Sequence, residues 1–301
     1  MNKLNYHEPV LLEPSISALI SDPSGVYIDA TYGGGGHSRG ILESLSLTGR
    51  LFAFDQDQEA IKNALEDPRF TLIEANFKDL KRFLKLHGIS KVDGILADFG
   101  VSSHQFDNGN RGFSTRFDGP LDMRMDQQAE KTAQAVVNAY SMEQLTRLFK
   151  YFGEVKGAFR VAEQIVHARK SKPITTTNEL VEVVKPLIPK RFLNQTLAQI
   201  FQAIRIEVNG ELDVIKAFLL QSAEVLKPMG RLVCIAYHSL EDRLVKQFIR
   251  QGVFEGEAPQ DFYGNRNLPF KKVGQLIVPS QEEIEQNTRA RSAKLRIAAK
   301  R

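Results

Sequence analysis

The chain has 301 residues, of which 42% are hydrophobic and 25% are charged, as in an ordinary globular protein. This composition excludes a disordered chain, a collagen-like repeat and a coiled coil, and the length suits one large domain or two ordinary ones. The single cysteine, Cys234, excludes an intramolecular disulfide and favours a reducing compartment. The net charge of +4 permits a polyanionic partner without requiring one.

The start of the chain and its hydropathy bear on location. No signal peptide follows Met1, and no apolar run approaches the roughly 20 residues that a membrane helix needs. We therefore expect a cytoplasmic protein with no membrane partner.

Short apolar runs alternate with helical spacing over the first hundred residues. The apolar runs predict strands over residues 26–32, 50–55, 70–75 and 92–98. The helical spacing predicts helices over residues 37–45, 58–65 and 80–86. This alternation is typical of an α/β protein with a parallel sheet and right-handed crossovers.

The middle of the chain has a different pattern. Residues 101 to about 125 form a long polar loop, and long ordered loops are usually functional. From Thr132 to about Asn209 the periodicity is only helical, with breaks at Pro186 and Pro189. The expected helices lie near residues 132–140, 142–152, 155–170, 176–186 and 195–208.

Strand–helix alternation returns after this block. The sequence predicts a helix over 211–226, a strand over 231–237, a helix from Ser239, as its N-cap, to about 249, and a weak closing strand over 292–298. Residues 251–275 read as irregular. We interpret the helical block as an insertion. The sheet domain is then discontinuous, over 1–105 and 211–301, and residues 106–210 hold the loop and an all-helical domain.

A run of glycines, Gly33 to Gly36, lies between the first strand and the first helix. Glycines at the carboxyl end of a strand let a ligand approach the backbone closely. Asp55 ends the second strand, where a carboxylate can accept both ribose hydroxyls of an adenosine-containing cofactor. The glycine run alone is also compatible with a tight turn, and Asp55 favours the cofactor interpretation.

The residues around the glycines discriminate between cofactors. A dinucleotide site prefers Gly-x-Gly-x-x-Gly, with the pyrophosphate over the helix N-terminus. Here Ser38 stands three positions after Gly35, and Asp29 precedes the glycines in the same strand. A carboxylate repels a pyrophosphate but attracts the sulfonium and ammonium groups of S-adenosylmethionine. The pattern therefore favours S-adenosylmethionine over NAD.

Asp98 ends the fourth predicted strand. The first and fourth strands normally flank the switch in strand order at which ligands bind, so we expect Asp98 to face the reactive end of the cofactor. A helix cap or a surface turn is the alternative role. Phe77, just past the third strand, can pack on an adenine or belong to the ordinary core. The single cysteine and six scattered histidines show no ligand spacing, which predicts a metal-free site.

Several sequence blocks together resemble one family, the MraW family of bacterial small-subunit ribosomal RNA methyltransferases H. The resemblance runs in order from about residue 6 to about residue 298, and the blocks at Asp118 and Tyr237 are the most specific. The blocks are Tyr6–Leu11, Tyr27–Ser38, Asp93–Ser103, Arg111–Ser114, Asp118–Met125, Phe201–Ile206, Tyr237–Arg243 and Asn287–Ser292.

The resemblance implies a Rossmann-like S-adenosylmethionine-dependent methyltransferase sheet with an inserted all-helical domain for substrate recognition. It also implies transfer of a methyl group to N4 of a cytidine in the decoding region of 16S rRNA, with the small ribosomal subunit as partner, and it allows a homodimer. Gly33 joins the cofactor contacts as part of the glycine run. The contacts carried over by resemblance are Gly35, Gly36, His37, Asp55, Phe77, Asp98 and Gln105. Small departures from the family pattern at Gly34, Gln56 and Phe99 remove none of them.

For such a reaction, Asp98 is the first candidate for the catalytic group. A carboxylate that accepts a hydrogen bond from the cytidine N4–H orients the amine toward the methyl and can later receive its proton. His238 and Ser239 are secondary candidates, and Glu241 and Asp242 read as charges at a helix start. The target base must be unstacked and held by an aromatic side chain. The aromatic candidates are Phe99, Phe106, Phe113 and Tyr237.

Basic residues in three regions are candidates for contacts with RNA phosphates. In the long loop they are Arg111, Arg116 and Arg124; in the helical block Lys150, Lys156, Arg160, Arg169, Lys170 and Lys172; and at the C-terminus Arg289, Arg291, Lys294, Arg296, Lys300 and Arg301.

Three other functions remain open at this point. The first is a methyltransferase with the same cofactor that acts on amines of DNA or of small molecules. The second is an RNA-binding assembly factor with a vestigial pocket, and the third is an NAD-dependent oxidoreductase.

Overall fold

The computed structural model describes residues 9–258, 260, 262–264 and 266–301. The first three residues of the sequence block at Tyr6 lie outside this described part. The described chain divides into two compact units. We call Val101–Glu211 the helical unit, and the described residues before and after it the sheet unit.

The sheet unit is built on one mixed sheet. Its strands, in chain order, are β1 (Val26–Asp29), β2 (Arg50–Asp55), β3 (Phe70–Glu74), β4 (Val92–Asp98), β5 (Leu226–Ala236), β6 (Phe270–Ile277) and β7 (Lys294–Lys300). They lie in the order β3-β2-β1-β4-β5-β7-β6. The first five strands of this order pair in parallel, whereas β7 pairs antiparallel with both β5 and β6. The prediction of a Rossmann-like α/β sheet is therefore confirmed.

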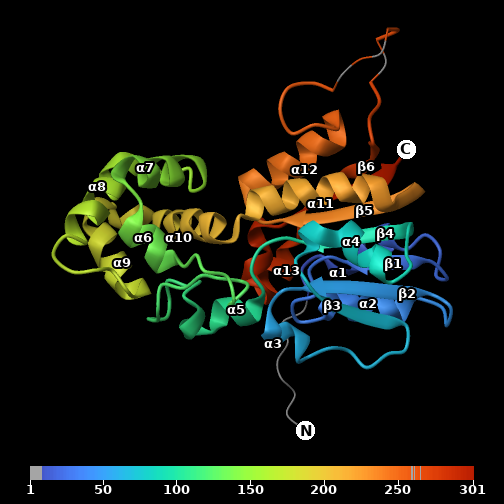
Figure 1. Ribbon diagram of the computed structural model, residues 1–301, viewed down its shortest axis with the longest axis horizontal. Coiled ribbons are helices and arrows are strands. Elements are labelled where there is room, and N and C mark those ends of the chain that lie inside the picture. The colour runs from blue at the N-terminus through green and yellow to red at the C-terminus, as the bar shows by residue number, and fades with distance from the viewer. Residues whose placement is uncertain (1–8, 259, 261, 265) are drawn as a thin grey trace. The chain divides into compact units, whose positions relative to one another are not determined.

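Helices cover both faces of this sheet (Figure 1). They are α1 (Leu12–Leu19), α2 (Gly36–Ser44), α3 (Gln58–Ile61), α4 (Leu80–Leu86), α11 (Glu211–Val225), α12 (Ser239–Gln251) and α13 (Gln281–Gln286). Side chains alternate across β5: Leu232 packs in the core under α4, α11 and α12, and Val233 packs in the core under α1 and α2. Burial on both faces explains why the central strands read as continuous apolar runs.

Two expectations for the C-terminal half are wrong. Residues 270–275, expected to be irregular, belong to β6, which runs to Ile277. This strand lies at the edge of the sheet and exposes most of its side chains, so no apolar run marks it. The N-cap of α12 is His238 rather than Ser239, and Glu241 completes a capping box with it.

The helical unit has its own apolar core, which includes Phe149, Leu180 and Ile204. Its helices are α5 (Ser103–Asp107), α6 (Ala133–Ala139), α7 (Met142–Tyr151), α8 (Ala158–Ala168), α9 (Thr177–Val184) and α10 (Leu193–Asn209). Two short 3₁₀ turns lie between α9 and α10. The first, Lys185–Leu187, contains Pro186, and the second, Lys190–Phe192, follows Pro189. All five helices expected between 132 and 209 are present, and the polar loop adds the short α5.

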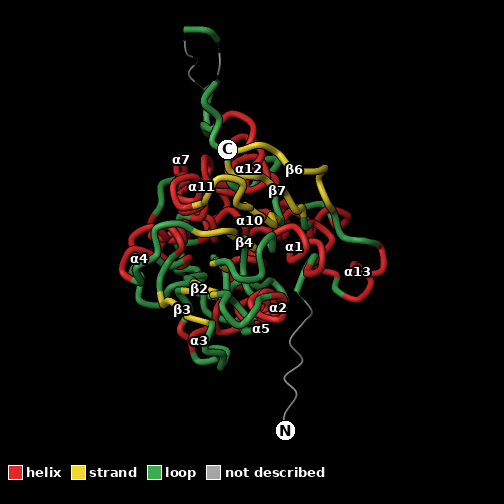
Figure 2. The backbone as a smooth tube through the Cα atoms, turned by 90° about the vertical axis from the view of Figure 1, so that its right-hand side faces the viewer, coloured by secondary structure: helices red, strands yellow, loops and turns green. Residues whose placement is uncertain are grey.

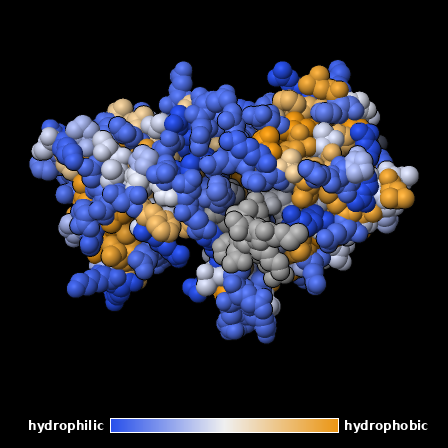
Figure 3. Space-filling model, turned by 90° about the horizontal axis from the view of Figure 1, so that it is seen from below, coloured by the Kyte–Doolittle hydropathy of each residue, from blue (hydrophilic) through white to orange (hydrophobic). Residues whose placement is uncertain are grey.

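No helix in the described part of the chain is long and apolar enough to cross a membrane. The face drawn in Figure 3 is largely hydrophilic, with apolar side chains gathered in separate patches.

Candidate cofactor and catalytic site

The carboxyl ends of β1, β2, β4 and β5 meet at one edge of the sheet, because these strands are parallel. Three of them end in a carboxylate: Asp29, Asp55 and Asp98. Ligands of open α/β sheets bind at this edge. It is therefore the place to look for the site.

Asp29 organises the glycine loop. Its carboxylate is fully buried and accepts hydrogen bonds from the Thr31 N–H at 3.0 Å and from the Ser38 hydroxyl at 2.7 Å. Burial raises the pKa of Asp29 above its ordinary value, while His37, Ser38 and Thr31 act in the opposite direction. Asp29 thus holds both ends of the glycine loop, one through Thr31 and the other through Ser38.

The loop itself requires glycine. Gly35 has a φ of +73°, and a Cβ there would lie 2.7 Å from the Tyr32 hydroxyl. A Cβ on Gly36 would lie 2.2 Å from a ring carbon of Pro9. Helix α2 begins at Gly36, and no described side chain caps its N-terminus. The first N–H groups of the helix therefore remain as donors for a ligand.

Asp55 closes the other side of the loop. Its two oxygens accept hydrogen bonds from the N–H groups of Gly33 and Asp57, both at 2.8 Å. A carboxylate has about four lone-pair sites, so two remain for a ligand. Burial raises the pKa of Asp55 to about 6, and the nearby charges of Asp57 and Asp29 act in the same direction.

Asp98 has an unused acceptor. Its N–H donates to the Thr31 hydroxyl at 2.7 Å, which joins the ends of β4 and β1. Its Oδ2 lies 3.7 Å from His37 Nδ1, and the hydroxyl of Tyr237 is close enough to lower the pKa of the carboxyl. Its Oδ1 is buried and has no hydrogen-bond partner among the described residues. Burial raises the pKa of Asp98 to about 6, against the opposing effects of His37 and Tyr237.

His37 connects Asp98 to the start of the described chain. Its ring is buried, and Nε2 lies 3.0 Å from the carbonyl oxygen of Val10. A carbonyl can only accept, so Nε2 carries a hydrogen and donates it. Nδ1, which faces Asp98, therefore donates only when the ring holds a second proton.

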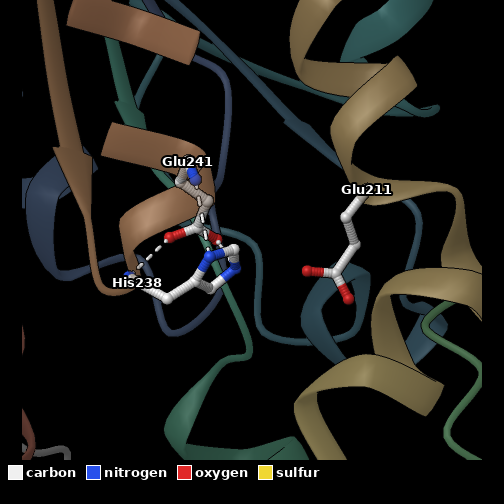
Figure 4. Close-up of side chains that lie close together, drawn as sticks. All are labelled: Glu211, His238 and Glu241. Atoms are coloured by element: carbon white, nitrogen blue, oxygen red, sulfur yellow. Dashed lines mark hydrogen bonds and ion pairs between the residues drawn. The ribbon is translucent and has the colours of Figure 1, made fainter. Parts of the chain in front are cut away.

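Tyr237, at the end of β5, is held by the start of α12. Glu241 Oε2 accepts hydrogen bonds from the N–H groups of Tyr237 at 2.8 Å and His238 at 3.2 Å. His238 Nε2 lies 3.0 Å from Glu241 Oε1, and Figure 4 shows these two side chains together. Glu211, also drawn there, pairs with Arg205 within the helical unit. These contacts make His238 and Glu241 structural supports of Tyr237.

The link from Tyr237 to Asp98 is a feature that the sequence analysis missed, because it considered this tyrosine only as a base-stacking residue. The available signal was position. Asp98 ends β4 and Tyr237 directly follows β5, and these two strands are neighbours in the sheet.

Phe77 belongs to an aromatic cluster beside this edge. Its ring centroid lies 6.2 Å from that of Phe99 and 5.3 Å from that of Phe218. Phe99 is buried, whereas Phe77 is only partly buried. A partly exposed Phe77 remains suited to contact an adenine, and Phe99 is not accessible to a target base.

The remaining candidate residues lie in the helical unit. Gln105 is buried there, and its amide oxygen accepts the Ser102 N–H at 3.2 Å as part of a capping box. Phe113 is buried. The expected cofactor contact of Gln105 and the expected base contact of Phe113 therefore stay predictions. The absence of a metal also stays a prediction.

Several of the basic residues proposed for RNA binding have partners within the fold, among them Arg111, Arg124 and Arg169. Arg111 is buried and donates to the carbonyls of Arg124 and Met125. Arg124 pairs with Asp122 at 2.7 Å, and Arg169 donates to two carbonyls at 2.6 Å. Arginines within a loop or between helices are as readily used for internal carbonyls as for phosphates. Arg116, Lys150, Lys156, Arg160 and Lys170 are exposed.

Comparisons with known proteins agree over nearly the whole chain. A protein of Flavobacterium johnsoniae named ribosomal RNA small subunit methyltransferase H is 60% identical over 297 residues, which cover 99% of this chain and 98% of that protein. A protein of the same name from Christiangramia forsetii is 58% identical with the same coverage. A crystal structure of an rRNA methylase from Streptococcus thermophilus matches 95% of this chain and 90% of that chain, with 13% identity and a TM-score of 0.38. The family model described as the MraW methylase family matches residues 5–301. The chain therefore belongs to the MraW methylase family.

Proposed function

We propose that this protein transfers a methyl group from S-adenosylmethionine to N4 of a cytidine in the decoding region of 16S rRNA. Family membership and the shared name of the relatives support the methyl transfer and the small-subunit rRNA substrate. The observation that carries the proposal is the buried Asp98 Oδ1, an unpaired acceptor at the carboxyl edge of the sheet. It is the group that an exocyclic amine requires.

The residues at this edge fit S-adenosylmethionine. The carboxylates of Asp29, Asp55 and Asp98 lie close enough for Asp29 to raise the pKa of both others. Such a cluster disfavours a pyrophosphate and favours a cationic cofactor. The uncapped start of α2 supplies N–H donors for the carboxylate of the cofactor. Asp55 retains acceptors for the ribose hydroxyls, and Phe77 offers an aromatic face for the adenine. When bound, the cofactor supplies an electrophilic methyl group on a sulfonium.

Asp98 would act on the amine. A cytosine amine is a weak nucleophile because its lone pair is delocalised into the ring. When the partly exposed carboxylate of Asp98 accepts one N4–H, the amine would be held with its lone pair toward the methyl. The carboxylate would take the proton that leaves as the new N–C bond forms and the bond between the methyl and sulfur breaks. Tyr237 lies beside this carboxylate and favours its charged form, which is the form that can accept the hydrogen bond.

The target base has to leave its stack to reach Asp98. Tyr237 is partly exposed beside Asp98, so it is the aromatic residue of the sheet unit best suited to contact the base. We assign residues 106–210 to substrate recognition, with their exposed cations on RNA phosphates. The cytoplasmic location and a homodimer also stay predictions.

The test uses small ribosomal subunits and naked 16S rRNA from a strain that lacks this protein. Each is incubated with the protein and methyl-labelled S-adenosylmethionine, and the label is located by nuclease digestion and mass spectrometry. We expect N4-methylcytidine at one site of the decoding region. Label at a carbon, a ribose or another base would overturn the N4 assignment.

Two further outcomes would favour other functions. Label in DNA or in small molecules but not in rRNA would favour an amine methyltransferase with a different substrate. Failure to bind S-adenosylmethionine would favour an RNA-binding assembly factor, or an oxidoreductase if NAD bound instead.

A further inference from the structure

A cavity of about 360 Å³ lies between α12, β6 and β7. Its volume falls within the range of about 300–1,000 Å³ that is common for ligand sites. Strand β6 is the edge of the sheet, and Figures 1 and 2 both place it beside α12. None of the residues assigned to the cofactor or to catalysis lines this cavity.

The cavity lies away from the cofactor edge. In the register of β7, Lys294 pairs with Ala236 at the carboxyl edge of the sheet, and Ala299 pairs with Arg231 further down β5. The β6 wall of the cavity begins at Phe270, which pairs with Lys300. Strands β5 and β7 lie between Asp98, at the end of β4, and the β6 wall of the cavity.

The rim of the cavity is positively charged. Lys246, Arg250 and Lys271 are exposed, and each lacks an ion-pair partner among the residues that the structure describes. No aspartate or glutamate among the described residues lines the cavity. The nearby carboxylate of Asp242 is neutralised by Arg296, whose Nε lies 2.6 Å from it. An anion at this rim would meet unopposed positive charge.

The floor of the cavity is apolar. Leu268 and Leu276 line it, and Leu276 is 39% exposed. An apolar floor inside a cationic rim matches the two parts of an unpaired nucleotide. Base faces bind apolar or aromatic surface, and phosphates bind lysine and arginine. In a duplex the base faces are stacked and cannot reach such a floor.

We propose that this cavity binds a single-stranded segment of the RNA substrate, with one unstacked base on the apolar floor and the flanking phosphates on Lys246, Arg250 and Lys271. The inference rests on the proposed RNA substrate and adds a second RNA contact remote from Asp98. Because no reacting atom is near, the cavity contributes to RNA affinity and leaves the chemical step unchanged.

The first test removes two rim charges from α12 in the full chain, in the double variant Lys246→Gln, Arg250→Gln. The matched control is Arg82→Gln, Lys85→Gln, which removes one lysine and one arginine from exposed positions of α4. Binding of a fluorescein-labelled oligouridylate is measured over a salt series. We expect the rim variant to bind about tenfold more weakly, with a salt slope lower by about 1.4, because each single-strand phosphate contact contributes about 0.7. Equal binding by both double variants would overturn the proposal.

The second test separates the base from the phosphates. The variant Leu276→Ser changes the floor and leaves the cations in place. We expect it to weaken binding of the oligouridylate severalfold and to leave binding of inorganic polyphosphate unchanged. Equal losses for both probes, or no loss for either, would overturn the role of the base.

Methylation kinetics keep this inference separate from the proposed function. With small ribosomal subunits as substrate, the rim variant should raise KM and keep kcat. A wild-type KM for the rim variant would refute the cavity proposal alone. Absence of rRNA methylation by the unchanged protein would refute the proposed function instead.

Discussion

The hydroxyl of Tyr237, just past the end of β5, lies beside the carboxylate of Asp98 at the end of the neighbouring strand β4 and lowers its pKa. The buried Oδ1 of this carboxylate has no hydrogen-bond partner among the described residues. Tyr237 is in turn held through its N–H by Glu241, a fully buried residue of α12. The sheet unit therefore presents one unpaired acceptor.

This relationship predicts the effect of Tyr237→Phe. The substitution removes a donor that favours the charged carboxylate, so the pKa of Asp98 should rise. We expect the acid limb of the kcat profile to move up by roughly one pH unit, since hydrogen bonds to charged groups contribute about 1.5–3 kcal/mol and one pKa unit equals about 1.4 kcal/mol. Tyr151→Phe, at an exposed position, is the control. An unshifted profile for Tyr237→Phe would show that the hydroxyl does not act on Asp98.

The pH dependence of the unchanged enzyme is a separate prediction. Asp98 accepts a hydrogen bond only as a carboxylate, and its pKa is about 6. The single-turnover rate at saturating cofactor should therefore be constant above about pH 7 and fall about tenfold per pH unit below about pH 6. Asp55, whose pKa is also about 6, should affect cofactor affinity in the same range, so saturation must be verified at each pH. A rate independent of pH between about 5 and 7 would contradict the role of Asp98.

Asp98 should also reduce the stability of the folded protein. Burial raises its pKa from the ordinary 3.8 to about 6, so the folded state binds more protons than the unfolded state between these values. The free energy of unfolding then decreases as the pH rises through this window, and the full penalty is present above about pH 6. Asp98→Asn, which cannot ionise, should increase the free energy of unfolding at about pH 7.5 by about 1–3 kcal/mol.

Chemical denaturation at two pH values checks this prediction. The gain from Asp98→Asn should shrink between about pH 7.5 and about pH 5, because the wild-type carboxylate becomes protonated there. A variant that is less stable than the wild type at about pH 7.5 would show that the charged form of Asp98 is favourable in the fold.

Ser38 predicts an effect of the opposite sign. Its hydroxyl donates to the fully buried carboxylate of Asp29 at 2.7 Å, so Ser38→Ala removes a donor from a buried charge. The free energy of unfolding should fall by about 1–3 kcal/mol. Cofactor affinity should also fall, because the glycine loop loses the hydrogen bond that joins its far end to Asp29. Ser44→Ala, on the exposed face of the same helix, should change stability by less than about 0.5 kcal/mol. Equal effects of the two substitutions would contradict this role of Asp29.

The sequence predicted the parallel sheet and the residues at its carboxyl edge well, for a physical reason. Central strands buried on both faces are continuous apolar runs, and their ends are marked by Gly33, Asp55 and Asp98. The edge strand β6 was not predicted, because an exposed strand needs no apolar pattern. Periodicity therefore identifies buried strands better than edge strands.

The roles of individual polar side chains were harder to predict. The sequence placed Arg111 and Arg124 on RNA, whereas the structure uses them on internal carbonyls and on Asp122. It also gave no sign that Tyr237 lies beside Asp98 and lowers its pKa. Such pairings depend on which strand ends and loops meet in three dimensions, and sequence spacing does not encode this.

The most direct test of the central claim is single-turnover methyl transfer to small-subunit rRNA by Asp98→Asn, with the affinity for S-adenosylmethionine measured separately by calorimetry. The account predicts that the variant still binds the cofactor, but more weakly because one carboxylate of the cluster is neutral, and that at saturating cofactor it transfers the methyl group at least about 100-fold more slowly. Near-normal transfer by the variant at saturating cofactor would contradict the account, because the amine would then need no acceptor at Asp98.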